Sequence, residues 1–397
     1  MKKLFGFAFA AALCAALVLL SCSNSSDSGS SGGGSEKIHS IAASYAPSNS
    51  WGNGWNLGNT LDAHVGEFSD KVNKGLSTET SWGAPETTQA MIKAIAAAGF
   101  KTIRIPVSWH NHITDTDGHK IDSAWLARVK TVVDWSLDAG MNVIINIHHD
   151  NLTEAQMATT YGFCVPEAGG ANYASLKTNS QTYITDIWKQ VATHFKDYND
   201  KLIFEILNEP RAVGKDYEWG ADTNEKKDKV SAANVIIKEY EKAALDIIRA
   251  SGGNNATRYL MVPPYAASPS LMDGWSLPTD SASNKLIVSV HAYTPYDFCM
   301  GKDNTFTAAH KSNIEDWLFA TLNTQFVSKN IPVIIGETSA SDKNNYAERV
   351  KWAKCFFAAA KAKGISCILW DNMKIYPEGD NIAERHGYFN RNNLSWY

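Results

Sequence analysis

The chain carries, at residues 202–211, the sequence Leu-Ile-Phe-Glu-Ile-Leu-Asn-Glu-Pro-Arg. Its first part is a short, crowded run of apolar residues, which is typical of a buried strand. Pro210 has no backbone N–H and a fixed φ, so the strand must stop before it. Asn208 and Glu209 therefore stand at the tip of the strand, where polar side chains cannot serve the core. We interpret this stretch as a carboxylate and an amide presented by a rigid element.

A second stretch repeats this arrangement. Residues 332–337 read Pro-Val-Ile-Ile-Gly-Glu, again an apolar run that ends in one carboxylate, Glu337. Two carboxylates on two strand tips are the minimum equipment for acid/base or nucleophilic chemistry on an acetal. The pair predicts an enzyme site built on strand ends.

Short apolar segments alternate with amphipathic ones from about residue 50 onward. The apolar segments lie at 54–58, 102–107, 142–148, 201–207, 259–263, 286–291, 332–337 and 366–370. Helical patterns separate most of them, at 85–99, 123–139, 176–196, 233–250, 312–328 and 344–363, whereas 268–277 is short and irregular. This alternation predicts a single α/β domain with a parallel sheet closed into a (β/α)8 TIM barrel. An open, doubly wound sheet is the alternative, although no Gly-x-Gly-x-x-Gly follows an early strand to indicate a dinucleotide site.

In a barrel of this kind the carboxyl ends of the strands converge on one face, where sites are built. Polar or aromatic side chains occupy most of these ends: Asn56 and Asn59, Arg104, His148 and His149, Asn208 and Glu209, His291 and Tyr293, Glu337, and Trp370 with Asp371 and Asn372. Any one of them could be a satisfied structural residue. Packing alone would not require the whole set, so the set predicts a functional site.

The residue types around the two Glu favour hydrolysis by paired carboxylates. No Gly-x-Ser-x-Gly follows a predicted strand, and His148-His149-Asp150 lacks the His-Glu-x-x-His spacing of zinc proteases. A His-His-Asp metal site is a minor alternative. We expect neither a cofactor nor a metal.

The ordered set of motifs resembles glycoside hydrolase family 5, the large cellulase family of TIM-barrel glycosidases. The motifs are Gly54-Trp-Asn-Leu-Gly-Asn-Thr-Leu-Asp62, Glu79-Thr-Ser-Trp-Gly83, Ile103-Arg-Ile-Pro106, Ile145-Asn-Ile-His-His-Asp150, Asn208-Glu-Pro210, Val290-His-Ala-Tyr293, Gly336-Glu337 and Leu369-Trp-Asp-Asn372. The opening motif looks most like the endoglucanase/xyloglucanase subfamily. The resemblance runs from about residue 51 to the end of the chain.

The resemblance implies catalytic and supporting roles by position. Glu209 would be the general acid/base and Glu337 the nucleophile of a retaining, double-displacement hydrolysis. Asn208 would bond the sugar 2-hydroxyl, and Tyr293 would donate a hydrogen bond to the nucleophile. Arg104 would keep Glu337 ionised, since a nearby cation lowers the pKa of a carboxylate. Glu209 would then hold the proton near neutral pH, because like charges resist joint ionisation.

The resemblance also implies sugar-binding residues. His148 and His291 would hold sugar hydroxyls and orient the acid. Trp370 would be the stacking floor of the bond-cleaving subsite. His149 and Asn56 would bind the sugar on the non-reducing side.

These roles favour an endo-β-1,4-glucanase whose partner is a cellulose-type or mixed-linkage β-glucan. A xyloglucanase, xylanase or mannanase with the same mechanism is an alternative, because loops such as 154–174 and 297–307 would shape the cleft. A lipid-anchored protein that binds glycans without cleaving them is a third hypothesis, and the intact pair of Glu209 and Glu337 argues against it.

The first 21 residues are predicted to be a lipoprotein signal peptide. Lys2 and Lys3 precede an apolar run, as in secretory signals. Leu19-Leu-Ser-Cys22 resembles a bacterial lipobox, which would make Cys22 the acylated residue; plain signal cleavage is the alternative. Residues 22–42 would be a Ser/Gly-rich tether, and 43–397 the catalytic domain. We therefore expect an exported lipoprotein of the bacterial cell envelope (outer membrane or cell surface), or a secreted protein, whose membrane contact is the lipid anchor alone.

Composition narrows the partners further. A net charge of −4 argues against a nucleic-acid partner, which would call for a basic face. We expect a monomer. Export permits disulfides, and one between Cys164 and Cys299, which both follow strand ends, is an open alternative.

Overall fold

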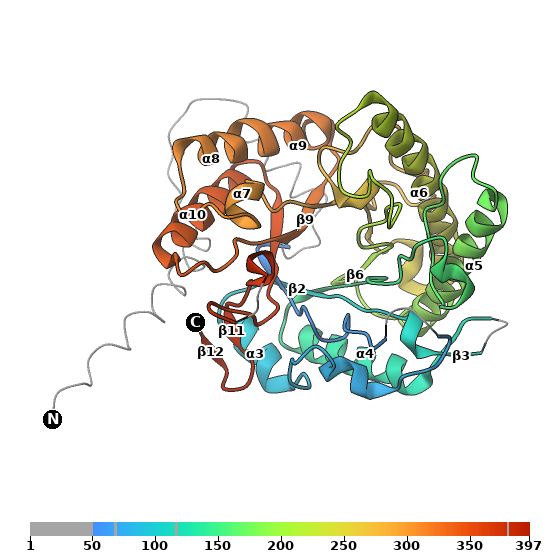
Figure 1. Cartoon of the computed structure of the whole chain (residues 1–397). Coiled ribbons are helices and arrows are strands. Elements are labelled where there is room, and N and C mark those ends of the chain that lie inside the picture. Colours follow the sequence, from blue (N-terminus) through green and yellow to red (C-terminus); the bar gives the residue numbers. More distant parts are fainter. Residues whose placement is uncertain (1–50, 67–69, 116–117, 379–380) are drawn as a thin grey trace.

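The computed structural model describes residues 51–66, 70–115, 118–378 and 381–397. At its centre is a closed barrel of parallel strands in the order β1-β10-β9-β8-β7-β6-β5-β2, ringed by helices (Figure 1). The strands are β1 (Gly54–Asn56), β2 (Thr102–Ile105), β5 (Asn142–Asn146), β6 (Leu202–Glu205), β7 (Leu260–Val262), β8 (Leu286–His291), β9 (Val333–Thr338) and β10 (Ser366–Leu369). Each lies in one of the apolar segments of the sequence, so the (β/α)8 prediction is confirmed and the open sheet is wrong.

Helices cover the outside of the barrel. The long ones are α3 (Gln89–Ala97), α4 (Ser123–Asp138), α5 (Tyr173–His194), α6 (Asn224–Ala250) and α10 (Tyr346–Ala362). After β8 the chain forms α7 (Tyr296–Cys299), α8 (Ala308–Ser312), the π-helical η6 (Asn313–Phe319) and α9 (Ala320–Gln325). Single 3₁₀ turns are η1 (Leu76–Thr80), η2 (His110–His112), η3 (Gln156–Ala158), η4 (Gly253–Ala256), η5 (Tyr265–Ala267), η7 (Val327–Lys329) and η8 (Ile382–Glu384).

Four features differ from the helical and strand patterns expected, and one of them is the start of α6 at Asn224, nine residues before the expected 233. The helix expected from Pro85 begins only at Gln89, because the Thr88 hydroxyl accepts the backbone N–H of Met91 and caps the helix there. The helix expected at 312–328 runs from Ala308 through α8, the π-helical η6 and α9 to Gln325, and the separate turn η7 follows it. Two short hairpins were not expected: β3 (Ile113–Asp115) with β4 (Lys120–Ile121), and β11 (Phe389–Asn390) with β12 (Ser395–Trp396).

Most large aromatic side chains pack between the barrel and the helices. Trp109, Trp125, Trp188 and Trp352 are buried there, and the Trp188 indole N–H donates to the carbonyl of Ile206, just beyond β6. These residues support the outside of the strands on which the polar strand-end residues stand.

The cysteines of the described residues form no disulfide. Cys164 and Cys299 are both free and buried, so the bond considered between them is not formed. The predicted signal peptide at 1–21, the tether at 22–42 and Cys22 lie outside the described residues. Within the described residues, no helix combines the length and the apolar character needed to cross a bilayer.

Candidate active site

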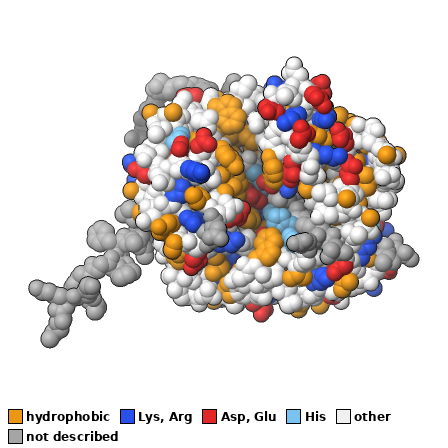
Figure 2. Space-filling model, viewed as in Figure 1, with side chains coloured by type: hydrophobic (Ala, Val, Ile, Leu, Met, Phe, Trp, Pro, Cys, Tyr) orange, Lys and Arg blue, Asp and Glu red, His pale blue; other side chains and the backbone are white. Residues whose placement is uncertain are grey.

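The interior of the barrel changes from apolar to polar toward the carboxyl ends of the strands. Its lower part is filled by an apolar cluster of Trp51, Ile144, Ile203, Tyr259, Met261, Ile287, Ile334 and Ile368. Side chains alternate across a strand, so residues two positions further along also point inward. On β5, β6 and β8 these are Asn146, Glu205 and Ser289, all buried. In Figure 2 the molecule is hollowed at its centre, and pale blue His and red acidic side chains lie in the hollow.

Arg104, on β2, is the centre of this polar layer. Its guanidinium is fully buried and donates to Glu205 Oε2 through Nε (2.7 Å), to Glu337 Oε1 through Nη1 (2.8 Å) and to Asn208 Oδ1 through Nη2 (2.6 Å). Nη1 also donates to Asn56 Oδ1 at 3.0 Å. Burial acts to lower the pKa of Arg104, but the two carboxylates raise it above its usual range. Arg104 is therefore a permanent cation that joins four side chains from three strands or their ends, β1, β6 and β9.

Glu337 reaches the interior because β9 contains a β-bulge. The pairing with β8 shifts just before His291, which lies opposite Glu337, so Gly336 is one extra residue. A bulge lets a strand turn a side chain that simple alternation would point to the other face. A Cβ on Gly336 would lie 3.0 Å from His291 Nε2 and 3.3 Å from Glu205 Oε1. The extra residue is thus a glycine because the polar layer leaves little room for a side chain.

Glu337 is almost completely buried and is held at both carboxylate oxygens. Oε1 accepts from Arg104, and Oε2 accepts from the Tyr293 hydroxyl at 2.9 Å. Burial raises the pKa of Glu337 above its ordinary value; the charges of His291 and Arg104 act against this, and that of Glu209 adds to it. Arg104 lies against Glu337 as expected, but burial raises the pKa of Glu337 more than the charge of Arg104 lowers it. Two donors aim this carboxylate, as an attacking group requires.

Glu209 follows β6 and faces His291. Its Oε1 lies 2.7 Å from His291 Nδ1, which lies 3.7 Å from Glu337 Oε2. Burial acts to raise the pKa of Glu209, but the hydrogen bond and charge of His291 bring it below its usual value. Burial acts to lower the pKa of His291, but the charges of Glu337 and Glu209 raise it. Both shifts favour the proton of this pair on His291, whereas the sequence predicts it on Glu209.

Two asparagines flank Arg104 and have different functions. Asn208 gives its Oδ1 to Arg104, so its Nδ2 is the end available to a ligand, in keeping with a bond to a sugar hydroxyl. Asn56 is fully buried and uses both ends, because Oδ1 accepts from Arg104 and Nδ2 donates to the Gly336 carbonyl at 2.9 Å. The structure thus places Asn56 as a support of Arg104 and not at the sugar-binding surface where we expected it.

Aromatic rings build another wall of the site. His148 and Trp370 stack in parallel with ring centroids 5.9 Å apart. His149 packs edge-on against His148 at 4.4 Å and lies beside Trp82 at 5.4 Å. The His149 side chain is 35% exposed, so this wall reaches the surface of the site. Flat faces with a few polar atoms suit the C–H-rich face of a sugar ring.

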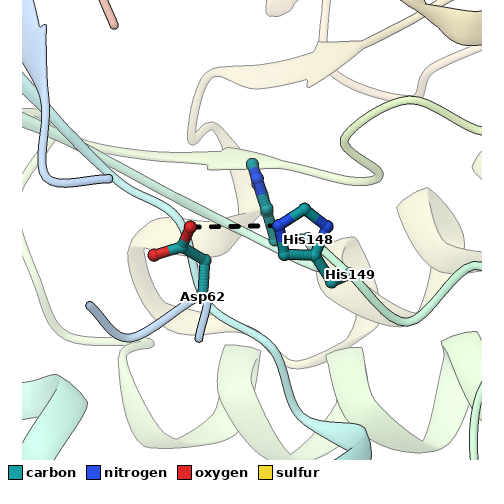
Figure 3. Close-up of side chains that lie close together, drawn as sticks. All are labelled: Asp62, His148 and His149. Atoms are coloured by element: carbon teal, nitrogen blue, oxygen red, sulfur yellow. Dashed lines mark ion pairs between the residues drawn. The ribbon is translucent and has the colours of Figure 1, made fainter. Parts of the chain in front are cut away.

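Asp62 lies next to this wall, and its ligand atoms and those of His148 and His149 stand within 4.8 Å of one another, a spacing that a metal ion could bridge (Figure 3). The dashed line in Figure 3 marks the 3.9 Å contact between Asp62 Oδ2 and His149 Nε2. Asp62 is fully buried and accepts the backbone N–H groups of Asn59 and Thr60. Burial raises its pKa to about 6 despite these bonds.

The hydrogen bonds of Asn146 decide whether His148 can be a metal ligand. Asn146 Oδ1 accepts from Val107 N at 3.1 Å, so its Nδ2 faces His148 Nδ1 at 3.0 Å and Glu205 Oε2 at 2.9 Å. An amide NH₂ only donates, so His148 Nδ1 accepts and its Nε2 carries the hydrogen. Burial lowers the pKa of His148 well below its usual value, which leaves the ring neutral. His148 is therefore a donor at Nε2, and this donor set does not fit a metal.

Sequence reasoning missed Glu205 and Asp62. Glu205 lies inside the apolar run 202–207, and alternation with the inward-facing Ile203 is the signal that would have found it. Asp62 is part of the opening motif, but its place beside His149 depends on how the loop after β1 folds over the barrel.

Comparisons with known proteins agree with this geometry. A model of the cellulase family, glycosyl hydrolase family 5, matches residues 62–374. The chain is 42% identical over 355 residues to Endoglucanase A of Clostridium longisporum, covering 87% of this chain but 62% of that protein, so it spans less than two thirds of that relative's length.

Two solved structures are similar along most of their length. A lichenase of glycoside hydrolase family 5 from Caldicellulosiruptor sp. F32, a mutant in complex with cellotetraose, is 38% identical with a TM-score of 0.76, covering 94% of both chains. A broad-specificity endoglucanase from Ruminococcus champanellensis with bound cellotriose is 38% identical with a TM-score of 0.73, covering 87% of this chain and 92% of the other.

Proposed function

This chain belongs to glycosyl hydrolase family 5, the cellulase family, and from that premise we propose that it is a retaining endo-β-1,4-glucanase acting on β-glucan. One observation carries the proposal. Glu209 and Glu337 stand at the carboxyl ends of two barrel strands, and an oxygen of each lies within 4.8 Å of the other and of a His291 nitrogen. Such close carboxylates support direct attack, because an inverting enzyme needs a gap of about 6.5–9.5 Å for a water molecule.

In the first step Glu337 attacks the anomeric carbon and the glycosidic C–O bond breaks. Arg104 and Tyr293 hold the attacking carboxylate in line. The leaving oxygen takes a proton from Glu209, which receives one from His291 across the 2.7 Å hydrogen bond. A glycosyl-enzyme ester on Glu337 results, and the negative charge of that carboxylate is lost.

In the second step Glu209 acts as the base. It takes a proton from a water molecule, which attacks the same anomeric carbon and releases Glu337 as a carboxylate. The proton returns to the pair of Glu209 and His291, so the site is restored. Arg104 and Tyr293 stabilise the charge that returns to Glu337, which makes it a better leaving group.

A glucan with β-1,4 linkages is the substrate that the relatives support best. One is named an endoglucanase, one a lichenase, and the two solved structures bind cellotetraose and cellotriose. The parallel rings of His148 and Trp370 offer a flat surface for such glucosyl units. Xyloglucan, xylan and mannan are the competing substrates, and a glycan-binding protein without hydrolysis is the competing function.

A panel of polysaccharides tests the proposal. Residues 43–397, purified and incubated with carboxymethyl cellulose, mixed-linkage β-glucan, xyloglucan, xylan and mannan, should release most reducing sugar from one of the two glucans first named. Initial products followed by NMR should keep the β configuration. Binding without any reducing sugar would refute enzymatic function, and α-configured first products would refute the assignment of Glu337.

We further propose that Cys22 is lipidated and that the domain works at the cell envelope. The lipobox-like Leu-Ser-Cys22 and the Ser/Gly-rich residues that follow support this. In the host, Cys22→Ser should move the protein from the membrane fraction to the soluble one. Unchanged membrane association would refute the proposal.

A further inference from the structure

A third carboxylate, Glu205, lies beneath the two that carry the chemistry. It is the last residue of β6 and is completely buried. Oε2 accepts from Arg104 Nε (2.7 Å) and Asn146 Nδ2 (2.9 Å), and Oε1 accepts from Ser289 Oγ (2.6 Å). A buried carboxylate is costly unless it is paired and fully hydrogen-bonded, and both conditions are met here.

The first function of this carboxylate is to hold Arg104. The guanidinium faces Glu205 Oε2 with Nε and Nη2, both at 2.7 Å, and its Nη1 and Nη2 also donate to Glu337 and Asn208. A planar guanidinium has its donors in one rigid fork, so fixing one edge fixes the others. Glu205 thereby orients Glu337 and Asn208 through Arg104, from the interior of the barrel.

The second function runs through Asn146. This residue lies opposite Glu205 in the register of β5 and β6, so the contact follows from the strand pairing itself. Glu205 takes one hydrogen of the Asn146 amide, and His148 Nδ1 takes the other. The bond to Glu205 acts together with the Val107 N–H, which donates to Asn146 Oδ1, to hold the NH₂ group toward His148, and this keeps the hydrogen of His148 on Nε2.

The third function is electrostatic. Glu205 Oε1 lies 4.0 Å from His291 Nε2, and Arg104 Nη2 lies 3.5 Å from the same nitrogen. The charge of Arg104 acts to lower the pKa of His291. The other charged groups facing His291 are Glu209 at 2.7 Å and Glu337 at 3.7 Å. The negative charge of Glu205 offsets the effect of Arg104 on the pKa of His291, the residue that supplies the proton for the leaving group.

We propose that Glu205 is a positioning residue that couples the two halves of the site, fixing the nucleophile through Arg104 and the His148 tautomer through Asn146. The proposal rests on the proposed function for its kinetic consequences. It makes Glu205 part of the reaction although it lies too deep to touch the substrate.

The variant Glu205→Gln separates charge from shape. Its amide oxygen can still accept from Arg104 and Asn146 while its NH₂ group faces Ser289, whose hydroxyl can turn to accept. Loss of the negative charge should lower the pKa values of Glu337, Glu209 and His291 together, because each has lost a neighbouring anion. Both limbs of the pH profile of kcat/KM should therefore move to lower pH, by about one unit. kcat at neutral pH should fall about 10- to 100-fold.

A second variant, Asn146→Ala, tests the part of the proposal that concerns the tautomer of His148. The ¹⁵N chemical shifts of the His148 ring report its tautomer, whether or not the protein has activity. The wild type and Glu205→Gln should show the hydrogen on Nε2, whereas Asn146→Ala should show a mixture and raise KM for β-glucan with unshifted pH limbs. The ring measurement tells a failure of this proposal apart from a failure of the proposed function.

The matched control is Glu79→Gln. Glu79 is also almost fully buried and paired with an arginine, Arg128, at 2.7 Å, but outside the barrel. The Glu79→Gln variant should be less stable than the wild type and keep the wild-type pH profile of kcat/KM. Wild-type pH limbs and kcat in Glu205→Gln would overturn the proposal. If that variant does not fold, an unchanged His148 tautomer and KM in Asn146→Ala would overturn it.

Discussion

The substitution Arg104→Lys asks how much of the catalysis depends on one guanidinium. Arg104 is fully buried and donates to Glu205, Glu337, Asn208 and Asn56 at 2.6–3.0 Å. A lysine keeps the charge but has a single ammonium group on a flexible stem, which cannot reach carboxylates and amides on several strands at once.

The expected magnitude follows from these contacts. Each hydrogen bond to a charged group contributes about 1.5–3 kcal/mol. Loss of one such bond in the aiming of Glu337 corresponds to roughly a 10- to 150-fold lower rate, since about 1.4 kcal/mol is tenfold. We therefore expect kcat to fall about 100-fold. KM should change little, because Arg104 has no exposed surface for substrate.

The assay should isolate the attack by Glu337. An aryl β-cellobioside with a leaving group that needs no proton reports the first step without Glu209. The control is Arg128→Lys, the same substitution at a site where the guanidinium holds Glu79 and the Thr87 carbonyl outside the barrel. The control should lower the thermal midpoint and leave kcat unchanged. A kcat of Arg104→Lys within threefold of the wild type would show that Arg104 only stabilises the fold.

Four further outcomes are expected. Glu337→Ala should lose turnover of natural glucan but form an α-glycosyl azide from an activated substrate and azide, whereas Glu209→Ala should give the β-azide; the opposite pattern by NMR would exchange the two roles. Because the pKa of His291 is raised, the alkaline limb of the pH–activity profile on unactivated glucan should lie above the ordinary histidine value of 6.5. This limb should disappear with aryl substrates, and a limb below 6.5 would contradict the assignment of His291 as the proton source. Extended treatment of the 43–397 domain with EDTA should leave its activity intact, and a loss reversed by one specific ion would show a metal requirement. Trp219 is 60% exposed on the loop after β6 and lies against Arg211, whose Nη1 donates to the Glu209 carbonyl, so Trp219→Ala should raise KM for polymer several-fold without affecting aryl cellobiosides, unlike the control Trp317→Ala at a tryptophan that is 40% exposed; equal effects of both would refute a platform for leaving-group sugars.

The barrel could be predicted because its signal is local and repeated. Each strand is a short apolar run bounded by Gly, Pro or polar residues, so β-strand positions were found within a few residues of their observed ends. Glu209 and Glu337 stood out because a polar residue directly after such a run has no place in a core. The helix start at Gln89 was missed because a proline is also favoured in a first helical turn, and the sequence does not show that the Thr88 hydroxyl accepts the Met91 N–H.

The deeper part of the site could not be predicted because it depends on contacts across the barrel. Asn56 was assigned to sugar binding from its position at a strand end, but the guanidinium of Arg104 above it takes up its side chain. The position of the proton between Glu209 and His291 depends on distances between strands far apart in the sequence. Local sequence patterns carry no information about such distances.

The extra residue in β9 has a consequence for protein engineering. Because Gly336 is an extra residue, the alternation of inward- and outward-facing side chains in β9 shifts by one position at this point. Glu337, which simple alternation would turn outward, therefore faces the interior. Grafting this nucleophile onto another barrel by substituting one side chain would leave it pointing at the surrounding helices. The transplant must instead lengthen the recipient strand by one residue, and glycine suits that position best, because the neighbouring His291 and Glu205 lie 3.0 and 3.3 Å from where a Cβ would stand.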